Sequence, residues 1–375
     1  MPGFVPPPYP YDRLSGLVAL ASAHEGGPID LSIGTPCDPP PQVVLDALAH
    51  SDAERGYPAS IGSVAYRTAA AGWLERRLGV TVDPATGLAA CIGTKEFVAG
   101  LPHLLRLRNP DRDTVLYPAV SYPSYEMGAI LAGCRAVPVP VDEHWRLRLD
   151  AIDPADAARA LCLWVNTPGN PAGALDDLDA AAAWGRSSGV LVCSDECYVE
   201  FTWVGERRTI LPAGADHSGL LAVHSVSKRS NLAGVRAGFY AGDPDLIGYL
   251  SEVRKHLGLM TAGPNQAAAA VAWADDAHVE AQRGRYLARL ERLAGALGGA
   301  GVDTSLPEGG FYLWVAAPHG DAWGLAERLA TVAGVVGSPG EFYGTASPGH
   351  LRLAVVLPDD RIERAAVRIE QAGLR

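Results

Sequence analysis

The sequence predicts an α/β protein, with a mainly parallel, seven-stranded sheet in a large domain and a smaller α+β domain. Three observations support this fold class: the length of 375 residues, a hydrophobic fraction of 48%, and short apolar runs that alternate with helical stretches between residues 89 and 243. A chain of this length exceeds one typical domain and can bury a large core. Apolar strands that alternate with helices are typical of parallel sheets covered by helices on both faces.

Seven near-continuous apolar runs account for the predicted strands. They cover residues 89–92, 114–117, 136–139, 160–165, 190–193, 220–223 and 237–240. Such continuity indicates strands that are buried on both faces. Because ligands gather at the carboxyl ends of parallel strands, the polar clusters that follow these runs are the candidate functional segments.

The pattern changes near Gly263, where a long Ala-rich and Arg/Glu-rich stretch over residues 264–297 predicts helix. Short strands are expected near residues 310–314 and 350–353. The Pro-rich opening lacks a strong period and is expected to form an arm or to join the smaller domain. We therefore expect an N-terminal arm and part of the small domain over residues 1–41, the large domain over 42–263, and the C-terminal small domain over 264–375.

Charge and composition argue against several classes of partner. The formal net charge of −11 disfavours nucleic acid and anionic membranes, which bind clustered Lys and Arg. The most apolar window, residues 267–274, is far shorter than the roughly 20 residues of a membrane span. The start of the sequence lacks the features of a signal peptide, so we expect a cytoplasmic protein. Six cysteines without a CxxC pair suggest reduced thiols and no metal site.

The most informative segment is Ser225-Val-Ser-Lys228, which directly follows a predicted strand and precedes Gly234-Val-Arg236. A lysine with a lowered pKa becomes a Schiff-base nucleophile, and bound pyridoxal phosphate would supply the aldehyde. The Ser225 hydroxyl and Arg236 can then hold the phosphate through charge-assisted hydrogen bonds. In isolation, this string is more often a pair of ordinary loop cations.

A second segment places Asp195 at the end of an apolar strand, with Tyr198 three residues on. A carboxylate there can keep the cofactor's pyridine nitrogen protonated, which makes the ring a better electron sink. Tyr198 can donate a hydrogen bond to the ring's phenolic oxygen. A metal ligand or a helix cap is the alternative for Asp195 taken alone.

Three further segments contain candidate cofactor ligands. Asn170 lies in an Asn-Pro-Ala-Gly turn and offers an amide to the same phenolic oxygen, although turn formation alone explains such a motif. Thr94 and Lys95 begin a helix whose free backbone amides suit a phosphate, or simply mark a helix start. Tyr122 can stack on a pyridine ring, with a structural aromatic as its alternative.

The order and spacing of these segments resemble fold-type-I, class I/II aminotransferases, and the likeness covers residues 31–356. The resemblance implies pyridoxal 5′-phosphate as cofactor, bound covalently by Lys228, with Asp195 on the pyridine nitrogen. The other cofactor-binding positions follow the same pattern. Asn170 and Tyr198 would contact the phenolic oxygen, Tyr122 would stack on the ring, and Thr94, Lys95, Ser225 and Arg236 would surround the phosphate.

Three more positions match the family pattern. Tyr57 resembles the tyrosine that reaches the phosphate of the neighbouring subunit, which implies a homodimer with a shared active site. Arg352, in His350-Leu-Arg-Leu, matches the arginine that binds the substrate α-carboxylate with bidentate geometry. Gly34 resembles the small residue that lets this carboxylate approach the backbone, where Asn170 would also contact the substrate.

Within the family, residues 228–234 and 30–36 are most similar to N-succinyldiaminopimelate aminotransferases of lysine and cell-wall biosynthesis. The resemblance therefore implies ping-pong amino transfer between glutamate and N-succinyl-2-amino-6-oxopimelate, in which Lys228 also moves the proton as general base and acid. Thr94 departs from the more usual serine of such enzymes but leaves the backbone cradle intact.

Other functions remain open at this point. The same cofactor residues serve aspartate, alanine or aromatic aminotransferases, and also cysteine-S-conjugate β-lyases. A transcription regulator with an aminotransferase-like domain would need a DNA-binding module, for which the short opening and the acidic charge leave little support. Lys95, Arg229 and Arg13 are cationic candidates for the far end of the substrate, although such residues more often face solvent.

Overall fold

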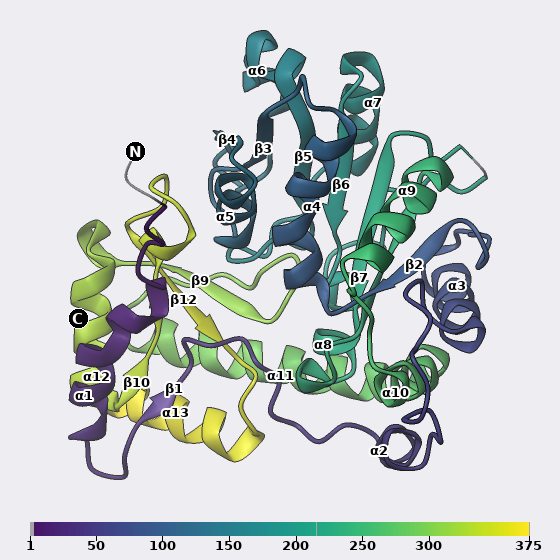
Figure 1. Cartoon of the computed structure of the whole chain (residues 1–375). Helices are drawn as coiled ribbons and strands as arrows, with labels where there is room; N and C mark the ends of the chain where they lie inside the picture. Colours follow the sequence, from purple (N-terminus) through teal and green to yellow (C-terminus); the bar gives the residue numbers. More distant parts are fainter. Residues whose placement is uncertain (1–3, 215, 375) are drawn as a thin grey trace. The chain divides into compact units, whose positions relative to one another are not determined.

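The computed structural model of this protein describes residues 4–214 and 216–374, which form two compact units (Figure 1). Within the described residues, unit 1 comprises 4–34, 286–307 and 311–374, and unit 2 comprises the remainder. The divisions therefore fall after residues 34 and 285 rather than after the expected residues 41 and 263.

Unit 2 contains one seven-stranded sheet, in the order β2-β8-β7-β6-β5-β3-β4. The strands are β2 (Leu88–Cys91), β3 (Thr114–Pro118), β4 (Arg135–Val139), β5 (Ala160–Asn166), β6 (Leu191–Asp195), β7 (Leu220–Ser225) and β8 (Gly238–Gly242). All neighbours from β4 to β7 are parallel, and β8 is antiparallel to both β7 and β2. The predicted mainly parallel, seven-stranded sheet is confirmed.

Helices cover both faces of this sheet. The helices of unit 2 are α2 (Gln42–Ala49), α3 (Val64–Leu78), α4 (Thr94–Arg108), α5 (Ser124–Leu131), α6 (Pro154–Arg159), α7 (Leu178–Ser188), α8 (Val226–Arg229), α9 (Pro244–His256) and α10 (Gly263–Ala274). Short 3-10 turns, among them η3 (Val199–Phe201) and η4 (Ala233–Val235), follow the strands. One core cluster joins α3, α7 and α10 to the sheet, and a second joins α4, α5 and α9, which Figure 1 shows in front of the strands.

The helix predicted over residues 264–297 is two helices, α10 and α11 (Ala277–Gly299). The break follows from Asp275, whose carboxylate accepts a hydrogen bond from the Ala277 amide at 2.9 Å and so begins the next helix. Helix α10 belongs to unit 2 rather than to the smaller domain, because Ala272 and Trp273 are buried in the same core cluster as Trp73 of α3.

Unit 1 contains the second, smaller α+β arrangement. Its elements are η1 (Pro10–Leu14), α1 (Ser15–Ser22), β1 (Ile29–Asp30), β9 (Tyr312–Ala316), η5 (Pro318–Gly320), α12 (Ala322–Ala333), β10 (Val335–Val336), β11 (Ser338–Pro339), η6 (Gly340–Tyr343), β12 (His350–Ala354) and α13 (Asp359–Ala372). The strands expected near residues 310–314 and 350–353 are confirmed as β9 and β12, which pair antiparallel with each other. The opening segment joins this unit, because β1 pairs with β10.

Neither a membrane span nor a metal cluster occurs in the described part of the chain. No helix there is long and apolar enough to cross a bilayer. Its His, Cys, Asp and Glu side chains likewise form no group of three or more that could hold a metal ion.

Candidate functional site

The candidate residues of unit 2 follow strand ends that meet at one edge of the sheet. Asn166, Asp195 and Ser225 are the last residues of the parallel strands β5, β6 and β7. Gly238 begins β8 at the same edge, because it pairs with Ser225 on one side and with Cys91 on the other. The turns that contain Thr94, Asp195, Lys228 and Arg236 are therefore brought to this edge by the strand register.

Asp195 is held by donors on both carboxylate oxygens. The Tyr125 hydroxyl donates to Oδ2 at 3.0 Å, and the Cys197 amide donates to Oδ1 at 3.2 Å. Although the side chain keeps some solvent exposure, desolvation raises the pKa of Asp195 above its usual value, against the effects of these donors and of the nearby charge of Lys228. The ionised form of such a carboxylate is stabilised by a cationic partner, for example a protonated ring nitrogen.

Two contacts of this site were not expected from the sequence. The Tyr125 hydroxyl reaches Asp195, and the Tyr125 ring packs at 5.4 Å from Trp164. The Cys197 thiol donates to Thr94 Oγ1 at 3.1 Å, so it links the turn after β6 to the start of α4. Tyr125 follows β3 within a few residues, and no local sequence signal indicates that it meets Asp195.

Ser225 shapes the short helix that carries Lys228. Its hydroxyl oxygen accepts a hydrogen bond from the Ser227 amide at 3.0 Å and so caps α8. The same hydroxyl lies 2.7 Å from Ser227 Oγ. Lys228 is partly exposed, and its charge acts on both Asp195 and Cys197. The structure therefore brings Lys228 and Asp195 into one electrostatic environment.

Arg236 and Gly93 lie against each other beside the start of α4. The guanidinium donates to the Ala233 carbonyl at 2.9 Å and to the Ile92 carbonyl at 3.3 Å. A Cβ on Gly93 would lie 2.3 Å from Arg236 Nη2, and the Gly93 φ of +76° also disfavours other residues. Gly93 has no side chain that could cap α4, so the N-cap residue does not compete with an anion at the start of the helix, next to an exposed guanidinium.

The remaining cofactor candidates of unit 2 occupy the same turns. Asn170 is buried, and its backbone amide donates to Asn166 Oδ1 at 2.8 Å. Asn166 Nδ2 in turn donates to the Asp195 carbonyl at 2.9 Å. Tyr198 is buried directly before η3. Lys95 is exposed, and its ammonium lies 3.3 Å from the Tyr122 hydroxyl. The Asn166 side chain thus ties two candidate turns together.

Arg352 and Gly34 both belong to unit 1. Arg352 is buried in β12, where its Nη2 donates to the Ser32 carbonyl at 2.6 Å and its guanidinium carbon lies 4.1 Å from the centre of the Tyr312 ring. A Cβ on Gly34 would lie 2.1 Å from the Tyr312 hydroxyl, which explains the glycine by packing. Tyr312 therefore belongs with Arg352 and Gly34, and the sequence did not single it out.

Two of the cations considered for the far end of the substrate, Arg229 and Arg13, contact other parts of the protein. Arg229 is buried inside unit 2, so the interpretation of Arg229 as a substrate-binding cation is wrong. Arg13 forms an ion pair with Glu341 at 2.5 Å. Tyr57, expected to reach a neighbouring subunit, is fully exposed in the single chain.

A buried acid and a histidine lie directly behind this edge. Glu196 Oε2 and His224 Nε2 are 3.2 Å apart, and both side chains are almost completely buried. Burial raises the pKa of Glu196 to about 8 and lowers the pKa of His224 to about 3. At neutral pH the pair is therefore uncharged, with one proton on Glu196.

Glu196→Gln should reduce the loss of stability at alkaline pH. The folded carboxyl keeps its proton up to about pH 8, whereas the unfolded one releases it near its ordinary pKa of 4.5. This contribution is complete below pH 4.5 and is lost as the pH rises through 8. His224 is neutral between pH 6.5 and 8.5. Over this range, we expect the free energy of unfolding of the wild type to fall by on the order of 1–2 kcal/mol more than that of Glu196→Gln.

Urea unfolding followed by circular dichroism at several pH values measures this difference. Glu252→Gln is the control, because Glu252 is exposed and pairs only loosely with Lys255. Parallel pH profiles for the wild type and Glu196→Gln would contradict the protonated state of Glu196.

Comparison with known proteins gives a consistent result. The family model for class I and II aminotransferases matches residues 27–369. OxyQ, a 4-dedimethylamino-4-oxo-anhydrotetracycline transaminase from Streptomyces rimosus, is 43% identical over 97% of this chain and 99% of its own. An LL-diaminopimelate aminotransferase from Desulforudis audaxviator is 35% identical over 97% of this chain and 95% of its own.

Among solved structures, a probable N-succinyldiaminopimelate aminotransferase from Thermus thermophilus is similar with a TM-score of 0.87 and 31% identity. The similarity covers 96% of this chain and 99% of that one. It therefore extends over both units.

Proposed function

This chain belongs to the class I and II aminotransferase family, and we propose that it transfers an amino group between glutamate and N-succinyl-2-amino-6-oxopimelate. As a member of this family it is a pyridoxal-phosphate-dependent enzyme that acts on amino and keto acids. One observation above all supports the proposed site: the strand register brings Asp195, Ser225 and the turn of Lys228 to one edge of the sheet.

Pyridoxal 5′-phosphate fits the donors at this edge. Asp195 suits the protonated ring nitrogen, because a largely desolvated carboxylate is stabilised by an adjacent cation. The amides at the start of α4, the Ser225 hydroxyl and the Arg236 guanidinium suit a phosphate. When bound, the cofactor supplies an aldehyde that takes up amino groups and a ring that accepts electrons.

We assign the covalent and proton-transfer roles to Lys228. Its Nζ would hold the cofactor covalently in the resting enzyme, and once released it would take the proton from the substrate α-carbon. Tyr198 and Asn170 would donate hydrogen bonds to the phenolic oxygen of the ring. Tyr122 would stack on the ring, and Thr94 and Lys95 would complete the phosphate site.

Arg236→Ala should weaken cofactor binding by about tenfold or more, since a charge-assisted hydrogen bond to phosphate is lost. Gly93→Ala should act in the same direction, because its Cβ would displace the Arg236 guanidinium. Absorbance titration of the apoenzyme with cofactor measures the dissociation constant. Arg148→Ala, which removes an exposed arginine paired with Asp150, is the control, and an unchanged constant in Arg236→Ala would refute the phosphate site.

The proposed substrate is supported by similarity. The Thermus structure and the LL-diaminopimelate enzyme connect this chain to acceptors and donors of the diaminopimelate type. Both proposed substrates present an α-carboxylate for Arg352. The succinylated acceptor carries two more carboxylates, which require additional cationic or amide donors in the site.

A panel of keto acceptors tests the substrate proposal. With glutamate as donor, we expect kcat/KM for the succinylated acceptor to exceed the values for oxaloacetate, pyruvate and phenylpyruvate, since this ratio reports transition-state binding. A preference of about tenfold, or roughly 1.4 kcal/mol, for one of the others would refute the substrate and leave the aminotransferase assignment standing. β-Elimination from cystathionine, measured in parallel, tests the lyase alternative.

A second candidate acceptor follows from the 43% identity to OxyQ. A polycyclic ketone of the tetracycline type has no α-carboxylate, so Arg352 would then serve only the amino donor. Including such a ketone in the panel distinguishes the two candidates, because only an acid acceptor should depend on Arg352.

We further propose a homodimer in which Tyr57 reaches the phosphate site of the partner subunit. The complete exposure of Tyr57 in the single chain supports this assignment, because a large aromatic side chain is seldom fully solvated. Mixing inactive Lys228→Ala chains with inactive Tyr57→Phe chains should restore some activity, because some heterodimers regain one intact site. A fully active monomer by light scattering would refute the shared site.

A further inference from the structure

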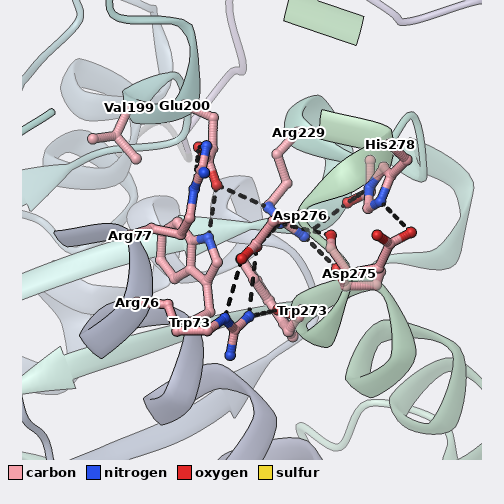
Figure 2. Close-up of polar contacts among 12 residues, drawn as sticks. Trp73, Arg76, Arg77, Val199, Glu200, Arg229, Trp273, Asp275, Asp276 and His278 are labelled. Carbon is pink, nitrogen blue, oxygen red and sulfur yellow. Dashed lines mark hydrogen bonds and ion pairs between the residues drawn. The ribbon is translucent and has the colours of Figure 1, made fainter. Parts of the chain in front are cut away.

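A buried carboxylate, Glu200, lies two residues beyond Tyr198 and collects several donors (Figure 2). The Trp73 indole donates to Oε1 at 2.7 Å, and Arg77 Nη2 donates to Oε2 at 2.8 Å. Arg207 Nε approaches Oε2 at 3.3 Å. Burial alone would raise the pKa of Glu200, but the arginines and Trp73 hold it below its usual value, so this carboxylate is ionised.

Arg229, the residue after Lys228, points into the same network (Figure 2). Its Nε lies 3.5 Å from Glu200 Oε1, and Nη1 donates to the Ala272 carbonyl at 2.5 Å. The guanidinium carbon lies 5.0 Å from the centre of the Trp273 ring. Although burial lowers the pKa of Arg229 to about 10, the side chain remains charged at neutral pH.

The ion pair therefore joins the two turns that carry Lys228 and Tyr198. Glu200 and Arg229 are each about 2% exposed, so solvent screens their interaction little. Each of the two residues is close in sequence to a proposed cofactor-binding residue. Glu200 lies in η3, which begins directly after Tyr198, and Arg229 shares the single turn of α8 with Lys228. A shift of either buried group must move the adjacent turn, because the packed core around Trp73 and Trp273 leaves no room for independent adjustment.

We propose that Glu200 and Arg229 are positioning residues, which hold the Lys228 turn and the Tyr198 turn at the separation that the reaction requires. The proposal rests on the function proposed above, in which Lys228 binds the cofactor and Tyr198 donates to its phenolic oxygen. Neither positioning residue touches the reacting atoms. Their contribution is the geometry, and a misplacement of about 1 Å at a reacting group can cost roughly a hundredfold in rate.

Glu200→Gln and Glu280→Gln form a matched pair of variants. Glu280 is half-exposed and contacts Arg77, Arg207 and Arg283, so it shares two arginines with Glu200 but does not contact Arg229. Both substitutions remove one carboxylate from the same group of arginines. Only the first removes the link between the two turns.

The decisive measurement is the pH midpoint of the absorbance of the lysine-bound cofactor in the holoenzyme. The Tyr198 hydroxyl stabilises the anionic phenolic oxygen, so its displacement should raise the midpoint by roughly 0.5–1 unit, equivalent to one hydrogen bond. Loss of the Glu200 charge without movement would lower the midpoint, because a negative charge favours the protonated nitrogen. The sign therefore separates positioning from a through-space charge effect.

We expect Glu200→Gln to raise the midpoint and to lower kcat by at least about tenfold, with KM for glutamate changed by less than about twofold. Glu280→Gln should leave both unchanged. Arg229→Lys keeps the buried charge but loses the planar guanidinium, so it should also raise the midpoint. If Glu200→Gln does not fold, the midpoint of Arg229→Lys tests the positioning role instead. A lowered or unchanged midpoint in the folded variant overturns the positioning role.

Tyr198→Phe separates this inference from the proposed function. It should raise the midpoint by itself, because it removes the hydroxyl directly. If Tyr198→Phe has no effect, or if borohydride does not attach the cofactor to Lys228, the proposed site fails. If both behave as expected while Glu200→Gln leaves the midpoint unchanged, only the positioning role fails.

Discussion

Replacing Lys228 by alanine is expected to lower kcat for amino transfer by more than about a thousandfold. The substitution removes the nucleophile that binds the cofactor and also the group that moves the substrate α-proton, and acid–base catalysis alone contributes about 10²–10⁴. The fold should survive, because Lys228 is partly exposed and the cap of α8 depends on Ser225 instead. Single-turnover kinetics with glutamate measure the loss.

Borohydride reduction followed by peptide mapping gives an independent readout. The sequence contains three lysines, Lys95, Lys228 and Lys255, so the labelled residue can be assigned without ambiguity. We expect the label on Lys228 alone. Lys255→Ala is the control variant, because this lysine is exposed in α9 and should leave both rate and labelling intact. A label on another lysine would overturn the assignment.

Replacing Arg352 by lysine should lower kcat/KM for α-amino acid donors by about a hundredfold. A bidentate, charge-assisted contact with the α-carboxylate is lost, and lysine cannot reproduce the planar fork. Losing one partner of a buried charged pair costs about 2–5 kcal/mol in comparable sites. The same change removes packing against Tyr312, so the thermal midpoint should also fall.

A donor amine without a carboxylate separates binding from stability. For such a donor, wild type and Arg352→Lys should react at the same rate, whereas general damage to the enzyme would slow both donors. Arg292→Lys serves as the control in unit 1, because Arg292 forms surface ion pairs with Glu363 and Glu370. Equal kcat/KM values for glutamate in wild type and Arg352→Lys would refute the carboxylate assignment.

The central sheet was predictable because its signal is local. Each strand contains an apolar run, and all seven overlap the runs that the sequence predicts. The break between α10 and α11 was missed, although Asp275 and Asp276 interrupt the Ala-rich pattern with a capping residue. The unit boundary was also misplaced, because α10 looks like the helices that follow it and only its burial against α3 assigns it to unit 2.

Arg229 illustrates the limit of sequence interpretation within the site. Beside Lys228 it looks like an available cation, but Trp73, Trp273 and Glu200 enclose it. These partners come from three distant segments, and no spacing along the chain indicates that they meet. The contact between Tyr125 and Asp195 was missed for the same reason, since Tyr125 follows β3 whereas Asp195 ends β6.

The sequence by itself determined the fold class, the family and the turns that carry Lys228, Asp195 and Arg236. These features depend on apolar periodicity and on short motifs, which act over a few residues. Only the tertiary structure decided which side chains hold those turns in place: Tyr125 on Asp195, Gly93 against Arg236, and Glu200 with Arg229 behind Lys228. Burial and contact between distant segments are properties of the packed chain, and packing selects among residues that look equivalent in sequence.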